Sequence, residues 1–425
     1  MNHNSYIRKV AISLIITIIS ILFLDDSIES AIIAGGLALF FNTITIYEVR
    51  GNKYLAVLFS VILYINASAY VLGVLTRGLT FNQYQWELWS SKYNSIGMKG
   101  ILITSCIFYI VMLRSSLNNN YQLHKPNIRN QNYIISIICL IISVLSCLFG
   151  FNGSAEDGEY QSNNSPIFEY AVLFYVLAWA YGNQNKILVR YWYVCSILYI
   201  FIALLAGDRS SSFMLLFVIA LNNINKLSLK RIFLFGFLGI MLANFIGQYR
   251  IGGIGGSIIL DLASRGLKTL FMDTAAQSYY TSLTIYEYNE TISNQLQLFG
   301  GWVISLFSGG LFIDRESINL AYLASMYDHN GGGGLFQPYF YLFGRFVGII
   351  IGSLLVAYII KNVYWKWNND YSNLLKVIIP AMSLRWYLYS PTTFFRTCII
   401  NFFFLYIIIN ICGRMIYSAN KSNNT

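Results

Sequence analysis

Long apolar stretches alternate with short polar segments along almost the whole chain. A helix that crosses a membrane needs roughly 20 apolar residues, and twelve segments approach that length: 10–24, 29–47, 54–75, 98–113, 133–151, 166–182, 187–206, 211–223, 232–247, 338–360, 373–390 and 397–416. Sheet-like alternation is absent, and in lipid only helices or closed barrels satisfy every backbone polar group. The pattern therefore predicts an all-α, polytopic integral membrane protein with about 12 transmembrane helices.

Composition agrees with this pattern. Hydrophobic residues make up 56% of the chain and charged residues only 11%, whereas a soluble domain carries about 25% charged residues. The six cysteines all fall inside apolar runs, so they predict neither a disulfide framework nor a zinc site. The first apolar run ends at Asp25-Asp26 without a small-x-small cleavage site, and we therefore expect a retained first helix rather than a signal peptide.

Charge is distributed unequally between the two sets of loops. With a cytoplasmic N-terminus, the inner segments hold 16 basic and 2 acidic residues, and the outer segments hold 8 basic and 15 acidic residues. The positive-inside rule predicts this bias for an even number of spans with both termini cytoplasmic. Omitting one span would reverse every later loop and remove the bias.

One outer segment, residues 248–337, is much longer than the other loops. We expect residues 1–425 to form a single polytopic membrane domain with this segment as an extracytoplasmic subregion, because long loops without a function are uncommon. Residues 261–289 have helical spacing, and the glycine-interrupted sequence FGGWVISLFSGGLFI is too short to span. The segment is therefore predicted to contain short interfacial helices and to lie on the outer surface as a lid.

Arginines cluster on the predicted outer side. Arg209 lies in the short turn GDRSS, Arg250 in GQYR beyond the ninth span, and Arg345 inside the tenth span, while Arg265 and Arg315 lie in the long outer segment. Arginine binds phosphate groups bidentately and stays charged at any biological pH. The cluster therefore predicts a polyanionic ligand at the outer leaflet, such as a lipid diphosphate. The alternative is that these side chains snorkel to lipid headgroups or pair with nearby acidic residues.

A candidate base precedes the tenth span. Asp328 and His329 stand before four glycines, 331–334, where His329 would act as a base or simply occupy a turn. The glycines are not a nucleotide-binding loop, because no Lys-Ser/Thr pair follows them. The aromatic loop 81–94 and the acidic loop 152–165 are more typical of an interfacial belt and a solvated turn than of sites. No metal or cofactor is expected.

The layout resembles the O-antigen or capsule repeat-unit polymerases, commonly called Wzy. The shared features are around twelve spans, an arginine in a short outer turn (GDRSS) and a long outer loop late in the chain. The stretch GGGGLFQPYFYLFGRFVGIIIGSLL is similar to the family's glycines entering a span, and the triplet Asp328-His329-Asn330 resembles the His-Asn element of O-antigen ligases. Gln337 departs from the family, since many relatives place a carboxylate shortly after the glycines.

The resemblance implies glycosyl transfer at the outer face of the bacterial inner membrane. A growing glycan on undecaprenyl diphosphate would move onto a new lipid-linked repeat unit. Arg209, Arg250 and Arg345 would bind the diphosphate, with Arg265 and Arg315 as secondary contacts, and His329 or Asp328 would be the base. The implied partners are the undecaprenyl-diphosphate-linked glycan, membrane lipid and a chain-length regulator protein, and no nucleic acid. A lipid-linked oligosaccharide flippase and an O-antigen ligase remain alternatives.

Overall fold

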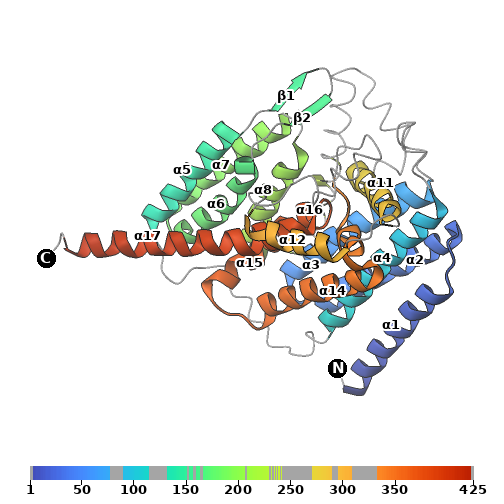
Figure 1. The fold of residues 1–425 in the computed structure, drawn as a ribbon. Helices are drawn as coiled ribbons and strands as arrows, with labels where there is room; N and C mark the ends of the chain where they lie inside the picture. Colours follow the sequence, from blue (N-terminus) through green and yellow to red (C-terminus); the bar gives the residue numbers. More distant parts are fainter. Residues whose placement is uncertain are drawn as a thin grey trace. The chain divides into compact units, whose positions relative to one another are not determined.

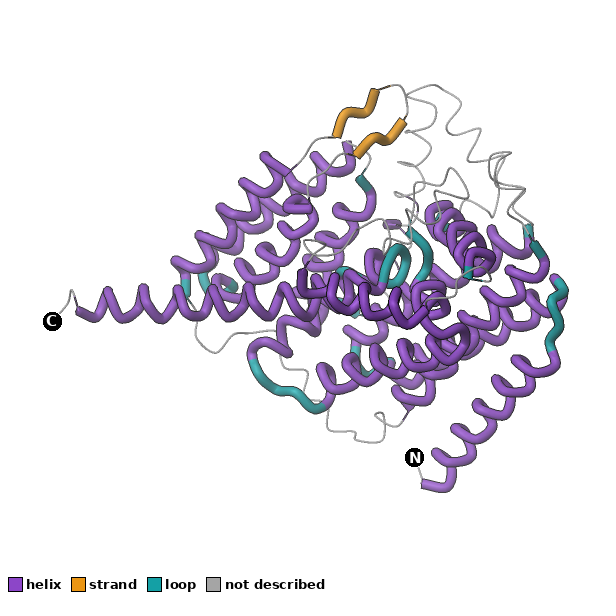
Figure 2. The backbone as a smooth tube through the Cα atoms, in the orientation of Figure 1, coloured by secondary structure: helices purple, strands orange, loops and turns teal. Residues whose placement is uncertain are grey.

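The computed structural model describes most of the chain (Figures 1 and 2). The described residues are 3–76, 90–113, 132–150, 153–156, 159–162, 166–205, 208–228, 270–289, 295–308 and 333–422, with isolated positions between 231 and 241. They are helical apart from short turns and one two-stranded hairpin. The hairpin pairs β1 (Gly153–Glu156) with β2 (Glu159–Ser162) in an antiparallel register.

Eight of the described helical segments are long and apolar enough to cross a membrane. They are Asn4–Phe23, Ile28–Val49, Lys53–Leu75, Ser91–Leu113, Tyr133–Gly150, Lys186–Leu204, Phe336–Trp365 and Thr393–Met415. Each coincides with one of the twelve predicted segments. Two shorter apolar helices, Tyr170–Gly182 and Ser210–Asn222, coincide with two more. The described chain is therefore that of a multi-pass helical membrane protein.

One predicted segment is not a continuous spanning helix in the structure, and another is largely outside the described residues. The segment 373–390 divides into α15 (Asp370–Ala381) and α16 (Ser383–Trp386). Pro380 lies inside the last turn of α15, and a proline there has no N–H to continue the helical ladder. The segment 232–247 lies largely outside the described residues, so a span there stays a prediction.

The described chain groups into two compact units. Unit 1 consists of Met1–Gln122, Leu267–Lys366 and Ser383–Thr393, and unit 2 of the intervening stretches and the C-terminal end. The helical elements of unit 1 are α1 (His3–Phe23), α2 (Ile28–Val49), α3 (Lys53–Ser68), the π-helix η1 (Ala69–Leu75), α4 (Ser91–Leu113), α11 (Asp273–Tyr288), α12 (Gln295–Ser308), α14 (Phe336–Trp365) and α16. Helix α4 packs against α1, α2, α11 and α14, and it is therefore the central element of this unit.

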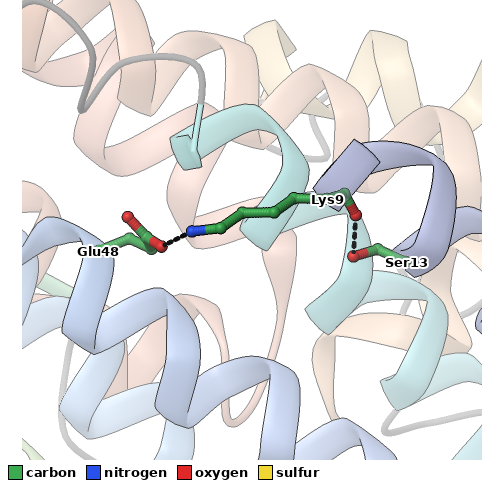
Figure 3. A network of polar contacts seen from close by, with 3 residues as sticks. All are labelled: Lys9, Ser13 and Glu48. Carbon is green, nitrogen blue, oxygen red and sulfur yellow. Dashed lines mark hydrogen bonds and ion pairs between the residues drawn. The ribbon is translucent and has the colours of Figure 1, made fainter. Parts of the chain in front are cut away.

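An ion pair joins the first two helices at one end (Figure 3). Lys9 Nζ, near the start of α1, lies 2.7 Å from Glu48 Oε1, near the end of α2. The Ser13 hydroxyl donates a hydrogen bond to the Lys9 carbonyl oxygen at 2.8 Å. The pair is partly buried, with the Lys9 side chain 40% and the Glu48 side chain 14% exposed. Both residues belong to the segments predicted to be cytoplasmic, so the contact is consistent with these two helix ends lying on the same side.

The turn between α1 and α2 is bound at the opposite end. The Asp25 carboxylate accepts hydrogen bonds from the hydroxyl groups of Ser27 and Ser30, and these bonds lower the pKa of Asp25 from 3.8 to about 2. The buried Lys99 of α4 donates to the carbonyl oxygens of Leu24 at 2.8 Å and Asp25 at 3.3 Å. A lysine ammonium here complements the carbonyls at the C-terminus of α1.

Helix α11 belongs to the segment that the sequence predicts to be a surface lid, and here the prediction is wrong. Most side chains of α11 are buried in unit 1. Tyr279 Oη donates to Asn94 Oδ1 at 2.9 Å, and Tyr280 Oη donates to the Gly73 carbonyl oxygen at 3.1 Å. The hydroxyls of Tyr279 and Tyr280 thus have partners on other helices, while those of Thr281, Ser282 and Thr284 donate to carbonyl oxygens within α11. These bonds help a helix of low apolar content to be buried.

Helix α12 fits the interfacial expectation better. It has 14 residues, fewer than a span needs. One face is buried through Trp302, whose Nε1 donates to Thr392 Oγ1 at 2.9 Å. Leu296, Ile304 and Phe307 are exposed. A short helix with one buried and one exposed apolar face is typical of an interfacial position.

Unit 2 contains the hairpin and a second group of helices. They are α5 (Tyr133–Gly150), α6 (Pro166–Gly182), α7 (Lys186–Leu205), α8 (Arg209–Asn222), η3 (Ile224–Lys226), α15, the π-helix η5 (Thr393–Asn401) and α17 (Phe402–Ser422). Helix α6 packs against α5, α7, α8 and α15. Aromatic stacking contributes to this packing, with the rings of Phe168 and Tyr199 4.8 Å apart.

Candidate functional site

Helix α14 is interrupted at Gly344 and Arg345. Gly344 has φ −178° and ψ 30°, and Arg345 has φ 51° and ψ −137°, so neither residue is helical. In an uninterrupted helix, Phe340 and Gly352 would lie about 18 Å apart along the axis. Instead, a side-chain carbon added at Gly348 would collide with the Phe340 carbonyl oxygen, and one added at Gly352 with the Phe340 ring. The segment 336–343, here called the half-helix, therefore folds back onto the rest of α14.

The first turn of the half-helix is held by bonds to two other segments. The backbone N–H of Leu335 donates to Ser282 Oγ of α11 at 3.0 Å. The backbone N–H of Phe336 donates to the Tyr387 carbonyl oxygen at 3.0 Å. Non-spanning backbone inside a membrane protein is tolerated where it is buried in protein or lines a cavity. These bonds satisfy donors at the start of the half-helix that have no partner within it.

Arg345 occupies the break itself, and its side chain is exposed. Among the described residues it is the one non-glycine residue with a positive φ. Such a conformation costs about 1–3 kcal/mol for a residue with a side chain, and it clusters at functional sites. Glycine would adopt it with less strain. A charged side chain retained at this point, where a smaller residue would be easier to fold, favours a role for the guanidinium.

Arg209 begins α8 in unit 2. The preceding Asp208 is the N-cap: its carboxylate accepts from the Ser211 backbone N–H at 3.1 Å, the Ser211 hydroxyl at 2.6 Å and the Ser210 hydroxyl at 2.9 Å. Asp208 is 3% exposed, and these bonds compensate a buried carboxylate. The predicted tight turn is therefore an N-cap that fixes the backbone of Arg209, whose side chain lies outside the described residues.

The other predicted site residues lie outside the described part of the chain. They are Arg250, Arg265, Arg315, Asp328 and His329. The structure therefore describes only Arg345 and the backbone of Arg209 from the predicted diphosphate site, and these two residues belong to different units. Convergence of the arginines stays a prediction.

Arg385 is a further arginine of unit 1, and it falls inside the predicted segment 373–390. It lies in α16, and its guanidinium is 5.4 Å from the centre of the Tyr389 ring. The Tyr389 carbonyl oxygen lies so close to Gly333 that a side-chain carbon there would collide with it. Gly333 is four positions after His329 in the sequence. The last of the predicted glycines thus pack directly beside the segment that follows Arg385.

A buried polar cluster, here called the amide–phenol cluster, joins Asn66 of α3, Gln337 of the half-helix and Tyr387. Gln337 Nε2 donates to Tyr387 Oη at 2.9 Å, and Tyr387 Oη donates to Asn66 Oδ1 at 3.1 Å. All three side chains are at most 1% exposed. From the sequence, Gln337 is visible only as a departure from a family pattern. Its available signal was a polar residue between Phe336 and Pro338 at the start of an apolar run.

No metal-binding arrangement emerges from the part of the chain that the structure describes. Groups of three or more His, Cys, Asp or Glu residues able to hold one ion are absent there. The described cationic side chains are compatible with anion binding without a metal, because arginine supplies both charge and hydrogen-bond donors.

The apolar helices place this protein in the class of multi-pass helical membrane proteins, and its helix α14 is broken at Gly344 and Arg345. Comparisons with protein-family models, with curated proteins and with solved structures gave no match.

Proposed function

We propose that the protein polymerises undecaprenyl-diphosphate-linked oligosaccharide repeat units into O-antigen or capsular polysaccharide at the outer face of the inner membrane. The growing glycan is transferred from its undecaprenyl diphosphate to a hydroxyl of a new lipid-linked unit. The bond between the glycan and the diphosphate breaks, a glycosidic bond forms, and undecaprenyl diphosphate leaves. The hydroxyl proton passes to a base.

The observation that carries the proposal is Arg345 in the strained break of α14. The reaction needs a cation where negative charge develops on the leaving diphosphate, and a preorganised arginine stabilises such charge without a metal. Arg345 is flanked by helical segments on both sides, so its backbone position is fixed more firmly than it would be in a flexible loop. The Arg345 side chain is exposed, so other side chains do not cover its guanidinium.

Arg209 is the second proposed contact to the diphosphate. Its backbone is fixed at the N-terminus of α8 by the Asp208 cap. The N-terminus of a helix carries partial positive charge, and anions are stabilised there. Arg250, Arg265 and Arg315 are proposed as further contacts, and His329 or Asp328 as the base that accepts the hydroxyl proton.

Polymer length in cells provides the test. Arg345→Ala and Arg209→Ala in cells that make the polysaccharide are expected to leave single capped repeat units and no ladder on a gel. Arg345→Lys should recover little, because lysine cannot replace a bidentate contact. Arg190→Ala is the matched control, since Arg190 is an exposed helical arginine on the predicted cytoplasmic side. A normal ladder from both outer variants at normal protein level would contradict the proposal.

A transporter is the second candidate, and the break in α14 is the observation that favours it. Interrupted helices are typical of secondary transporters, where they form substrate sites near the middle of the membrane. Loss of a flippase would keep lipid-linked units on the cytoplasmic leaflet, so that even single capped units would be missing. Loss of an O-antigen ligase would leave long polymer on undecaprenyl diphosphate. The same variants therefore distinguish all three activities.

A further inference from the structure

The amide–phenol cluster has hydrogen-bonding capacity that the described residues do not use. Gln337 Oε1 and Asn66 Nδ2 are buried without a hydrogen-bond partner among the described residues. Gln337 is 0% exposed and Asn66 1%. Each unused atom belongs to the same amide group as the atom that contacts the Tyr387 hydroxyl. Both unused atoms therefore belong to amide groups that contact the Tyr387 hydroxyl, one on α3 and one on the half-helix.

Reversing the hydrogen bonds does not remove the unused capacity. If both amides were turned over, Asn66 Nδ2 would donate to Tyr387 Oη and Tyr387 would donate to Gln337 Oε1. Asn66 Oδ1 and Gln337 Nε2 would then be unused, which is again one acceptor and one donor. The phenol has one proton, so it cannot satisfy both amides fully in either direction.

The chemistry of the missing partner follows from this count. Burying an amide atom without a hydrogen bond destabilises the folded protein, and native proteins almost always satisfy such atoms. A single partner that contacts both atoms would donate to one amide and accept from the other. A hydroxyl group does both, whereas a carboxylate or phosphate only accepts and an ammonium only donates.

We propose that Asn66, Tyr387 and Gln337 form a binding site for an O–H group, which donates to one amide oxygen and accepts from the other amide nitrogen. The O–H group is supplied either by a water molecule or by a hydroxyl of a saccharide. The second source rests on the proposed function, and the site itself does not. Buried waters of this kind make about three hydrogen bonds to otherwise unsatisfied groups.

The position of the site connects it to Arg345. Gln337 lies in the first turn of the half-helix, and Arg345 lies in the break at its other end. The last helical residue before the break, Phe343, is about 9 Å from Gln337 along the axis at 1.5 Å per residue. An O–H group bound to Gln337 and Asn66 ties the half-helix to α3. Occupancy of the site therefore fixes the element from which Arg345 projects.

The first experiment is a cryo-EM map of the purified full-length protein, without added saccharide, at a resolution that shows other buried waters. Density within hydrogen-bond distance of both the Gln337 and Asn66 amides supports the proposal and identifies water as the source. A second map is recorded with free N-acetylglucosamine and glucose at millimolar concentration. Density that occurs only with sugar supports the proposal and identifies the saccharide. Absence of density in both maps overturns it.

Thermal unfolding provides an independent arm. For a saccharide hydroxyl, free N-acetylglucosamine or glucose raises the unfolding temperature of the unaltered protein but not of Gln337→Met, whose side chain is similar in size and has no amide. If water is the source, sugar changes the unfolding temperature of neither the unaltered protein nor Gln337→Met, and the density in the first map shows whether the site is occupied. Because both maps use the unaltered protein, the site is testable even if Gln337→Met does not fold.

The two proposals can fail separately. Density at the amide–phenol cluster together with a normal polymer ladder from Arg345→Ala and Arg209→Ala would retain the O–H site and reject the polymerase. Absence of density at the cluster together with loss of the ladder would reject the O–H site and retain the polymerase.

Discussion

At the scale of single residues, the sequence is most informative where a side chain acts on its immediate neighbours. Asp208 and Ser211 are three positions apart, the spacing of an N-cap and its backbone partner, so the anchored turn GDRSS could be predicted. Asn66 and Tyr387 are 321 positions apart. Their hydrogen bond exists only because the tertiary fold brings two helical segments together, and no local pattern indicates it.

The Asp208 cap predicts a stability effect. Asp208→Ala removes the acceptor for the Ser211 backbone N–H and two hydroxyls, and loss of an N-cap costs about 0.5–2 kcal/mol. We expect a lower unfolding temperature in detergent, with most of the loss recovered by Asp208→Asn, because asparagine is also a good N-cap. Equal unfolding temperatures for Asp208→Ala and the unaltered protein would show that the cap does not stabilise α8.

The turn between α1 and α2 predicts a pH dependence. Hydroxyl hydrogen bonds from Ser27 and Ser30 lower the pKa of Asp25 from 3.8 to about 2. A carboxylate with a lowered pKa adds stability above its unfolded pKa and loses it as pH falls through its folded pKa. The difference in unfolding temperature between the unaltered protein and Asp25→Asn should therefore be constant above about pH 4 and shrink toward pH 2. A difference that grows on acidification would contradict the assignment.

At the scale of elements, apolar length predicts where helices lie but not where they break. The eight long apolar helices all coincide with predicted segments, because the length of a span is set by the bilayer. The interruption of α14 begins at Gly344, and the fold-back is permitted by Gly348, which faces the Phe340 carbonyl oxygen, and by Gly352, which faces the Phe340 ring. Glycines are equally compatible with a straight transmembrane helix, so sequence alone does not decide between the two.

Helix α11 illustrates the opposite error. The long outer segment that contains it is predicted to be a surface lid, yet Tyr279 and Tyr280 contact buried partners on α4 and η1. A buried polar helix is stable only when nearly every hydroxyl is satisfied. Those partners come from distant parts of the chain, so no local sequence pattern indicates them. The sequence for this reason predicts a lid where the structure has a buried helix.

The fold-back of the half-helix predicts a sharp difference between two glycines. Gly352→Leu places a side chain into the Phe340 ring, and overpacking a filled site costs about 1–3 kcal/mol or more. Gly36→Leu in α2 is the control, since a side-chain carbon there meets nothing within 4 Å. We expect loss of folded protein in size-exclusion chromatography only for Gly352→Leu. If both variants behave alike, the half-helix does not pack against Gly352.

At the scale of the whole molecule, the charges of the loops predict on which side of the membrane each loop lies. The Lys9–Glu48 pair lies at the end of the α1–α2 hairpin that the loop charges predict to be cytoplasmic. The joint position of the predicted site residues is beyond sequence patterns, because Arg209 and Arg345 belong to separate units and Arg250, Arg265, Arg315, Asp328 and His329 lie outside the described residues.

Direct binding of undecaprenyl diphosphate to the purified protein tests the central claim, which is that Arg345 presents its guanidinium to a lipid diphosphate. The measurement is native mass spectrometry across a series of lipid concentrations. Charge-assisted hydrogen bonds contribute about 1.5–3 kcal/mol, so Arg345→Ala should weaken binding by about 10- to 100-fold. Alanine keeps the strained backbone, so the comparison isolates the side chain. Arg190→Ala should bind normally. Equal affinity of Arg345→Ala and the unaltered protein would contradict the account.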